Sequence, residues 1–260
     1  MSESTASPGC SEALSIALDL GEKMVQCGAE INRVENTIER ICAAYGYKKV
    51  DCFSITSLII ATVRPENAEP VTQVRRIYNY TTNLNRLEKL NSLSRSVCSE
   101  LPDLKTVRNR INAVFEEKRA VHPSVLLGYM LSAAAFAVFF GGTLFDALAT
   151  VPISAVQFTL DTLIKRKGVN RILFTVIPSA ISGVMAIGFT RLVPFLNQDK
   201  IIIGCIMPLI PGLQLTNSLR EMFCGDTMSG FIRLLEALMI SVAIALGFAV
   251  PLIIFGGLRG

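Results

Sequence analysis

The stretch FIRLLEALMISVAIALGFAVPLIIFGGL, from Phe231 to Leu258, decides what kind of protein this chain forms. After Arg233 and Glu236, near its start, it carries no further charged residue. The stretch is longer than the about 20 apolar residues that a membrane-spanning helix requires. We therefore expect an integral membrane protein.

Other apolar runs lie toward the amino terminus from this stretch, but nearly all of them follow residue 122. The spacing of the runs predicts five spans, at about residues 123 to 140, 143 to 164, 172 to 191, 201 to 220 and 230 to 257. The residues before them are charged and globular in character. The fold class expected is an α+β cytoplasmic domain, residues 1–120, followed by an all-α transmembrane bundle of about five spans, residues 121–260.

The basic residues that flank the predicted spans indicate the orientation of the chain. An inside amino terminus puts eight of them on the cytoplasmic side: Lys118, Arg119, Lys165, Arg166, Lys167, Arg171, Arg220 and Arg233. Three would lie outside: Arg191, Lys200 and Arg259. This bias predicts a multi-pass protein of the inner membrane, N-in and C-out, with a cytoplasmic N-terminal domain. We expect no cleavable signal, because the first twenty residues lack a basic segment and a clean apolar segment.

Composition excludes several classes of function. The seven cysteines include no C-x-x-C pair, which argues against a disulfide framework or a zinc site and favours reduced thiols. There is one histidine, and neither a P-loop nor a nucleophile elbow is present. The net charge of +4 comes without a basic patch interleaved with aromatic residues. We expect no enzyme activity, no cofactor, no metal site and no nucleic-acid partner.

Alternation and helical spacing predict the elements of the N-terminal domain. They are helices at 12–27 and 30–44, strands within 47–64 and 69–77, and helices at 83–98 and 104–119. In the second helix Glu30 and Arg33 are three residues apart, a pair worth only about 0.2–0.5 kcal/mol when exposed. This charged start is either a solvated face or a face that docks against the inner ends of the spans.

Polar residues recur along the second predicted span at spacings of 4, 4, 3 and 4: Asp146, Thr150, Ser154, Gln157 and Asp161. The spacing puts them on one side of a helix, and this polar stripe must face protein or water rather than lipid. Two simpler roles stay open for its acids. Asp146 completes a capping box with Thr143, and Asp161 precedes Lys165 by one turn.

The fourth predicted span is interrupted within MPLIPGLQLTNSLREMF, from Met207 to Phe223. Pro208, Pro211 and Gly212 come about 10 to 17 Å into the membrane at 1.5 Å per residue. Broken helices at this depth build the substrate sites of transporters, although a simple packing kink is the alternative. The site expected here comprises Pro208, Pro211, Gly212, Gln214, Asn217, Arg220 and Glu221, with Asp146, Gln157 and Asp161 from the polar stripe. Arg220 would attract a carboxylate, or else extend to the interface or pair with Glu221.

Four stretches resemble successive signatures of the threonine/serine exporter family. They are GAEINRVENTIERI, GGTLFDA, PLIPGLQLTNSLREMFCGD and SGFIRLLEAL, and their order and spacing match over residues 12 to 258. The chain is similar to the larger subunit of the split, two-component form. The motif positions carried over are Gly28, Glu30, Arg33, Glu35, Gly142, Asp146, Pro211, Gly212, Asn217, Gly225, Asp226, Arg233 and Glu236.

This resemblance implies a subunit of a two-component secondary exporter of small metabolites across the inner membrane. Its substrate would be an amino acid such as threonine or serine, or a dicarboxylate such as succinate. The implied partners are a small multi-span membrane subunit, a small-molecule carboxylate substrate and membrane lipid. The alternative is a non-transporting membrane sensor or assembly subunit whose cytoplasmic domain binds a metabolite. The broken span and the polar stripe favour transport, because an anchor needs neither.

Overall fold

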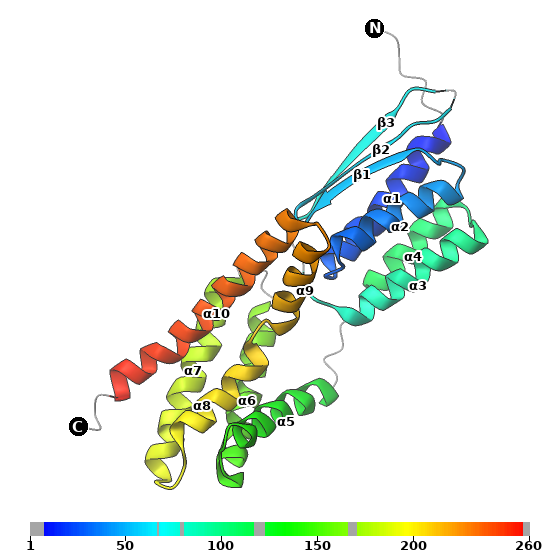
Figure 1. Ribbon diagram of the computed structural model, residues 1–260. Coiled ribbons are helices and arrows are strands. Elements are labelled where there is room, and N and C mark those ends of the chain that lie inside the picture. Colours follow the sequence, from blue (N-terminus) through cyan, green and yellow to red (C-terminus); the bar gives the residue numbers. More distant parts are fainter. Residues whose placement is uncertain (1–7, 67, 79–80, 117–122, 166–170, 257–260) are drawn as a thin grey trace. The chain divides into compact units, whose positions relative to one another are not determined.

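The computed structural model describes residues 8–66, 68–78, 81–116, 123–165 and 171–256. Within these ranges the chain is mostly helical and has one small sheet (Figure 1). It divides into two compact units. The N-terminal unit comprises Met1–Arg119 and Thr216–Arg233, and the span unit comprises Ala120–Leu215 and Leu234–Gly260.

The N-terminal unit combines a three-stranded antiparallel sheet with helices. Its elements are α1 (Pro8–Gln26), α2 (Ile31–Ala44), β1 (Val50–Ile55), β2 (Leu58–Val63), β3 (Val71–Arg76), α3 (Leu84–Glu100), α4 (Leu104–Glu116), and parts of α9 and α10. The sheet order is β1-β2-β3, and Val63 of β2 pairs with Val50 on one side and Val71 on the other. The alternating stretch 47–64 is therefore a hairpin that turns at Thr56 and Ser57.

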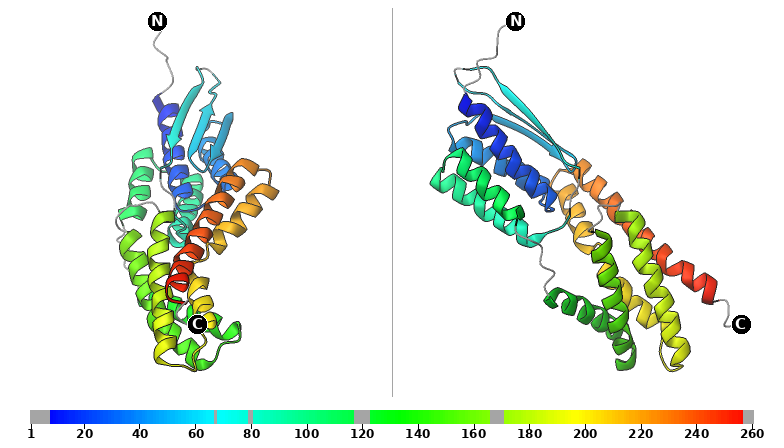
Figure 2. Two further views of the ribbon diagram at one scale, coloured as in Figure 1. Left: turned by 90° about the vertical axis from the view of Figure 1, so that its left-hand side faces the viewer. Right: turned by 180° about the vertical axis from the view of Figure 1, so that it is seen from behind.

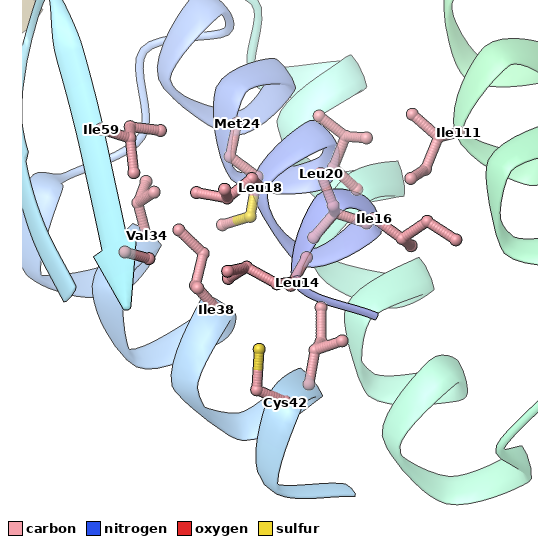
Figure 3. Close-up of a cluster of buried hydrophobic side chains, with 14 of the residues drawn as sticks. Leu14, Ile16, Leu18, Leu20, Met24, Val34, Ile38, Cys42, Ile59 and Ile111 are labelled. Atoms are coloured by element: carbon pink, nitrogen blue, oxygen red, sulfur yellow. The ribbon is translucent and has the colours of Figure 1, made fainter. Parts of the chain in front are cut away.

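The core of this unit lies on both sides of α1. Helices α1 and α2 cover one face of the sheet, where Ile59 is fully buried (Figure 2). Figure 3 shows Ile38 of α2 and Leu18 of α1 on the side of Ile59, and Ile16 of α1 on the side of Ile111. Because α1 is buried on opposite faces, it is more apolar than a surface helix would be.

The span unit is built from α5 (Pro123–Phe139), α6 (Leu144–Lys165), α7 (Arg171–Leu192), α8 (Gln198–Ile206), a 3-10 turn η1 (Met207–Leu209), the start of α9 (Gly212–Phe223) and most of α10 (Thr227–Gly256). Helix α5 packs against α6 and α8, and α7 packs against α6 and α8. Ile153, Ile201 and Ile244 are among the side chains of a small shared core.

Small residues let these helices approach closely. A Cβ atom at Gly247 of α10 would collide with the Cβ atom of Ser179 on α7. A Cβ atom at Gly204 of α8 would lie 2.7 Å from the backbone oxygen of Ala133 on α5. Contacts of this kind hold helices together in lipid, where burial of apolar surface gives little drive for association.

The predicted fold class is wrong in the number of spans. Among the described residues, three helical segments are long and apolar enough to cross a membrane: Leu144–Ile164, Thr175–Leu192 and Thr227–Phe255. A fourth candidate is the pair Gln198–Leu209 and Gly212–Phe223, which is bent by 53° at the break. The predicted first span is the shorter helix Pro123–Phe139, which ends just before the turn at Gly141, where φ is +88°.

The predicted fold class is also wrong about a separate α+β domain. The N-terminal residues share their unit with Thr216–Arg233, which the sequence assigned to the membrane bundle. The described chain is predominantly helical, and its sheet is a minor part of one unit. The physical reason is that charged residues at the end of α9 and the start of α10 pair with, or hydrogen-bond to, the start of α2.

The orientation stays a prediction. Five of the flanking basic residues, Lys118, Arg119, Arg166, Lys167 and Arg259, lie outside the described residues. Of the cations assigned to the cytoplasmic side, Arg220 and Arg233 belong to the N-terminal unit.

Candidate functional site

Helix α6 carries the polar stripe, and its side chains turn inward. Asp146, Thr150, Ser154 and Gln157 are all fully buried, and Asp161 is half-buried. Two of these residues form side-chain hydrogen bonds to backbone carbonyls of their own helix. The hydroxyl of Thr150 donates to the Ala147 carbonyl at 2.7 Å, and Ser154 donates in the same way to the turn before it.

Asp146 forms the capping box that its spacing suggested. Its Oδ2 atom accepts hydrogen bonds from the Thr143 backbone N–H at 2.7 Å and the Thr143 hydroxyl at 2.8 Å, while the Asp146 N–H donates to Thr143 Oγ1. The carboxylate also binds the residue before α8. Its Oδ1 atom accepts from the Asn197 N–H at 2.7 Å, and Oδ2 accepts from the Asn197 amide at 3.1 Å. Asp146 thus fastens the start of α6 to the start of α8.

Gln157 is in the opposite situation. Both atoms of its side-chain amide are buried, and neither has a hydrogen-bond partner among the described residues. A buried amide left in this state costs about 1–3 kcal/mol, so native proteins rarely keep one without a reason. The Nε2 atom of the amide can donate hydrogen bonds, and its Oε1 atom can accept them. The described residues supply a partner for neither of these two groups.

Tyr129 of α5 is a further polar group that sequence reasoning missed. Its ring contacts that of Phe158, the residue after Gln157, with ring centres 5.4 Å apart. Its hydroxyl is buried, and the described part of the chain offers it no hydrogen-bond partner. Nothing in the sequence pattern indicates this, because an aromatic residue in an apolar run usually lies at the interface or packs in a core.

The break in the fourth predicted span lies between η1 and α9. Pro208 is within η1, buried Pro211 precedes α9, and exposed Gly212 begins it. The N–H of Gly212 donates to the Ile210 carbonyl at 2.8 Å instead of continuing the helical ladder. Just past the break, Gln214 is buried, and its Oε1 atom has no partner within the described ranges. The helix is therefore interrupted next to a second unsatisfied amide.

Further along α9, Asn217 is half-buried, and the next charged residues belong to the N-terminal unit. Arg220 forms an ion pair with Glu30 at 2.7 Å rather than with Glu221. Glu221 forms an ion pair with Arg233 of α10 at 2.9 Å, and both side chains are almost fully buried. Glu30 therefore pairs with a residue of α9 within the N-terminal unit, whereas Arg33 at the same helix start is exposed.

The amino terminus of α2 is capped by residues far away in the sequence. Its own N-cap residue, Glu30, makes no side-chain cap hydrogen bond. Glu221 Oε1 accepts from the Ile31 N–H at 3.3 Å, and the carboxylate of Asp226 accepts from the next N–H in the helix. Arg233 completes the contact by donating to the Ala29 carbonyl at 2.7 Å. Carboxylates suit this position because free N–H groups and the helix dipole favour negative charge there.

Outside the candidate spans, the carboxyl groups of Asp226 and Glu35 have raised pKa values. Burial raises the pKa of Asp226, against the effect of its hydrogen bond from the α2 backbone. Burial also raises the pKa of Glu35, although the carboxylate accepts hydrogen bonds from the N–H and hydroxyl of Ser54 at 2.6 and 3.0 Å. A raised carboxyl pKa means that the folded chain holds the proton more tightly than the unfolded chain. As the pH rises from the ordinary pKa of a carboxyl group through the raised pKa of the folded chain, these two groups therefore make folding less favourable.

Comparison with known proteins agrees with the sequence signatures. Residues 15–255 match the family described as "Putative threonine/serine exporter". The chain belongs to the threonine/serine exporter family. It is 23% identical over 248 residues to the "Probable threonine/serine exporter" of Mycobacterium tuberculosis, which covers 93% of this chain and 46% of that protein. No solved structure matches the chain.

Other relatives in the exporter family are nearly as long as this chain. The "Probable succinate transporter subunit YjjP" of Klebsiella aerogenes is 25% identical over 245 residues, covering 91% of each protein. The protein of the same name from Escherichia coli strain K12 is 25% identical over 252 residues, covering 94% of this chain and 95% of that protein. The chain thus spans about half the length of the mycobacterial relative and most of the length of the subunits.

Several of the exporter-family motif residues are glycines that allow a left-handed backbone conformation or a close backbone contact. Gly28 has a φ of +90° and Gly225 a φ of +100°, conformations that other residues rarely adopt. A Cβ atom at Gly142 would lie 2.7 Å from the Ala137 carbonyl oxygen. The remaining motif residues, Arg33 and Glu236, are exposed and half-buried, respectively.

Proposed function

We propose that this chain is one subunit of a two-component secondary exporter of small metabolites, either an amino acid such as threonine or serine or a dicarboxylate such as succinate. The arrangement is supported by a relative that is named a transporter subunit, which the chain matches over 91% of each protein. A small multi-span membrane subunit would supply the other half. We place both in the inner membrane, with the N-terminal unit in the cytoplasm.

The observation that carries the proposal is the unsatisfied amide of Gln157. It belongs to the buried polar stripe of a membrane helix, where an unsatisfied polar group is costly and marks function. In the proposed path its Nε2 atom donates to a substrate carboxylate, and its Oε1 atom accepts from a substrate ammonium or hydroxyl group. Gln214, at the broken span, offers a second acceptor, and Asn217 lies one turn further along α9.

Arg220 and Glu221 take a different part in this proposal. Both are engaged with the start of α2 in the N-terminal unit, so we assign them to holding α9 and α10 there rather than to binding substrate. Asp146 also has a structural role in this proposal, since its carboxylate accepts hydrogen bonds from Thr143 and Asn197 within the span unit. The proposed path therefore depends on neutral amides more than on charges.

Export should require the second subunit. Cells expressing this chain together with a multi-span neighbour are expected to release preloaded serine, threonine or succinate, whereas cells expressing the chain alone should release none. The physical reason is that transporters of this kind bind substrate between two related halves. Strong efflux from the purified chain reconstituted by itself would refute the two-component arrangement. Absence of efflux with the partner present would instead favour the sensor role.

Replacing Gln157 with leucine should separate transport from stability. We expect Gln157→Leu to reduce efflux about tenfold or more at matched membrane abundance, since one lost hydrogen bond of about 1.4 kcal/mol corresponds to that factor. Thermal unfolding should be unchanged or shifted upward, because a leucine leaves no buried amide unsatisfied. Thr159→Val is the matched control, since this exposed residue lies on the same helix and its hydroxyl donates to the Ala155 carbonyl one turn earlier. Wild-type efflux in Gln157→Leu would remove Gln157 from the path.

A further inference from the structure

A polar cleft in the N-terminal unit plays no part in the proposed transport path. It lies where α1, β3 and α4 meet, and its volume is about 430 Å³. This volume falls in the range of about 300–1,000 Å³ that is typical of small-molecule sites. Arg75 of β3 and Arg108 of α4 reach into it beside Asp19 of α1. None of these residues belongs to the motifs that identify the family.

The cleft carries an excess of positive charge. Asp19 is shared by two guanidinium groups, with its Oδ1 atom 3.0 Å from Arg75 Nη2 and its Oδ2 atom 3.4 Å from Arg108 Nη2. One carboxylate therefore faces two cations. Lys23 and Glu22 also line the cleft and cancel each other's charge. The lining thus has a formal excess of one positive charge, which a small anion would neutralise.

The two arginines are held unequally. Arg75 donates from Nε to Asp19 at 3.1 Å and from Nη2 to the Ser15 hydroxyl at 2.9 Å, which are ordinary hydrogen bonds. Arg108 reaches the same two groups only at 3.4 Å, and half of its side chain is exposed. A guanidinium group has five N–H donors, and most of those on Arg108 have no partner among the described residues and can meet a ligand. Its planar fork matches a carboxylate with two parallel hydrogen bonds.

Ile111, which is buried, is the apolar residue of this otherwise polar lining, and Asn112 follows Arg108 by about one helical turn on the same face of α4. We propose that this cleft binds a small carboxylate metabolite, held by Arg108 and Arg75, at a site separate from the transport path. Bound there, the ligand bridges α4 to α1 and β3.

Isothermal titration of the full-length chain in detergent tests this site, with succinate, serine, threonine and inorganic phosphate as separate titrants. All titrations use the Gln157→Leu background, so that binding in the proposed path does not contribute. We expect at least one carboxylate to bind, and Arg108→Gln to weaken it at least tenfold. Binding of succinate alone would identify a dicarboxylate site, and binding of serine or threonine an amino-acid site. Both results support the proposal.

Arg110→Gln is the matched control, because Arg110 lies on the same helix but pairs with Glu100 of α3 at 3.0 Å. Its affinity should equal that of the parent chain. Hydrogen exchange should show ligand-dependent protection of residues 104–116 and 8–26 in the parent and the control, and not in Arg108→Gln. The proposal is overturned if no carboxylate binds, if Arg108→Gln binds as the parent does, or if phosphate binds as tightly as the carboxylates.

Discussion

Replacing Arg233 with methionine should lower the free energy of unfolding by about 3–5 kcal/mol, because it leaves the carboxylate of Glu221 buried without its cation. Arg233 is 3% exposed, and its guanidinium group binds both Glu221 and the Ala29 carbonyl, at 2.9 and 2.7 Å. The measurement is thermal unfolding of the purified chain in detergent. A shift on the order of 10 °C corresponds to this loss in a chain of about this size.

Two further variants make the Arg233 result specific. Arg220→Gln removes the neighbouring ion pair between Arg220 and Glu30. Because the Arg220 side chain is 63% exposed, the free energy of unfolding should fall by less than about 1 kcal/mol. Combining Arg233→Met with Glu221→Leu should recover part of the loss, since no uncompensated charge then remains buried. If Arg233→Met were as stable as Arg220→Gln, the buried pair would not be what holds these helix ends to α2.

The second large effect is expected at Asp146. Asp146→Ala removes the acceptor of four hydrogen bonds, two from backbone N–H groups at 2.7 Å, and it unfastens α8 from α6. A hydrogen bond to a charged group contributes about 1.5–3 kcal/mol, and the orphaned N–H groups add their own cost. We therefore expect a loss of at least about 3 kcal/mol, measured as reduced thermal stability and a reduced yield of monodisperse protein.

Asp146→Asn distinguishes the structural role from a role in the transport path. The amide keeps the shape of the carboxylate, but one of its two terminal atoms becomes a donor and faces the N–H groups of Thr143 and Asn197. A fall in stability together with a loss of efflux supports the structural role. An abundant, stable variant that no longer exports would restore Asp146 to the path. Asp199→Asn is the control, since Asp199 is an exposed acid in the first turn of α8.

The polar stripe shows how far periodicity alone can lead. Spacing placed Asp146 and Gln157 on one side of a helix, and the structure buries both. Spacing could not say that Asp146 is hydrogen-bonded while the Gln157 amide has no partner among the described residues. One partner of Asp146 is Asn197, which is 51 residues away in the sequence. The predicted number of spans is wrong for a related reason. Whether an apolar run crosses a membrane depends on where its helix ends and bends, and the bend of 53° is a property of the assembled break.

The sequence by itself determined the features that depend on neighbours in the chain. Apolar length predicted membrane helices, Pro208 and Pro211 predicted the break, Thr143 and Asp146 predicted the capping box, and the signatures predicted the family. Only the tertiary structure decided which charges meet. Glu30 had Arg33 within reach on its own helix, yet it pairs with Arg220, 190 residues away. A local exposed pair is worth only a few tenths of a kcal/mol, so packing that brings a distant partner close easily overrides it.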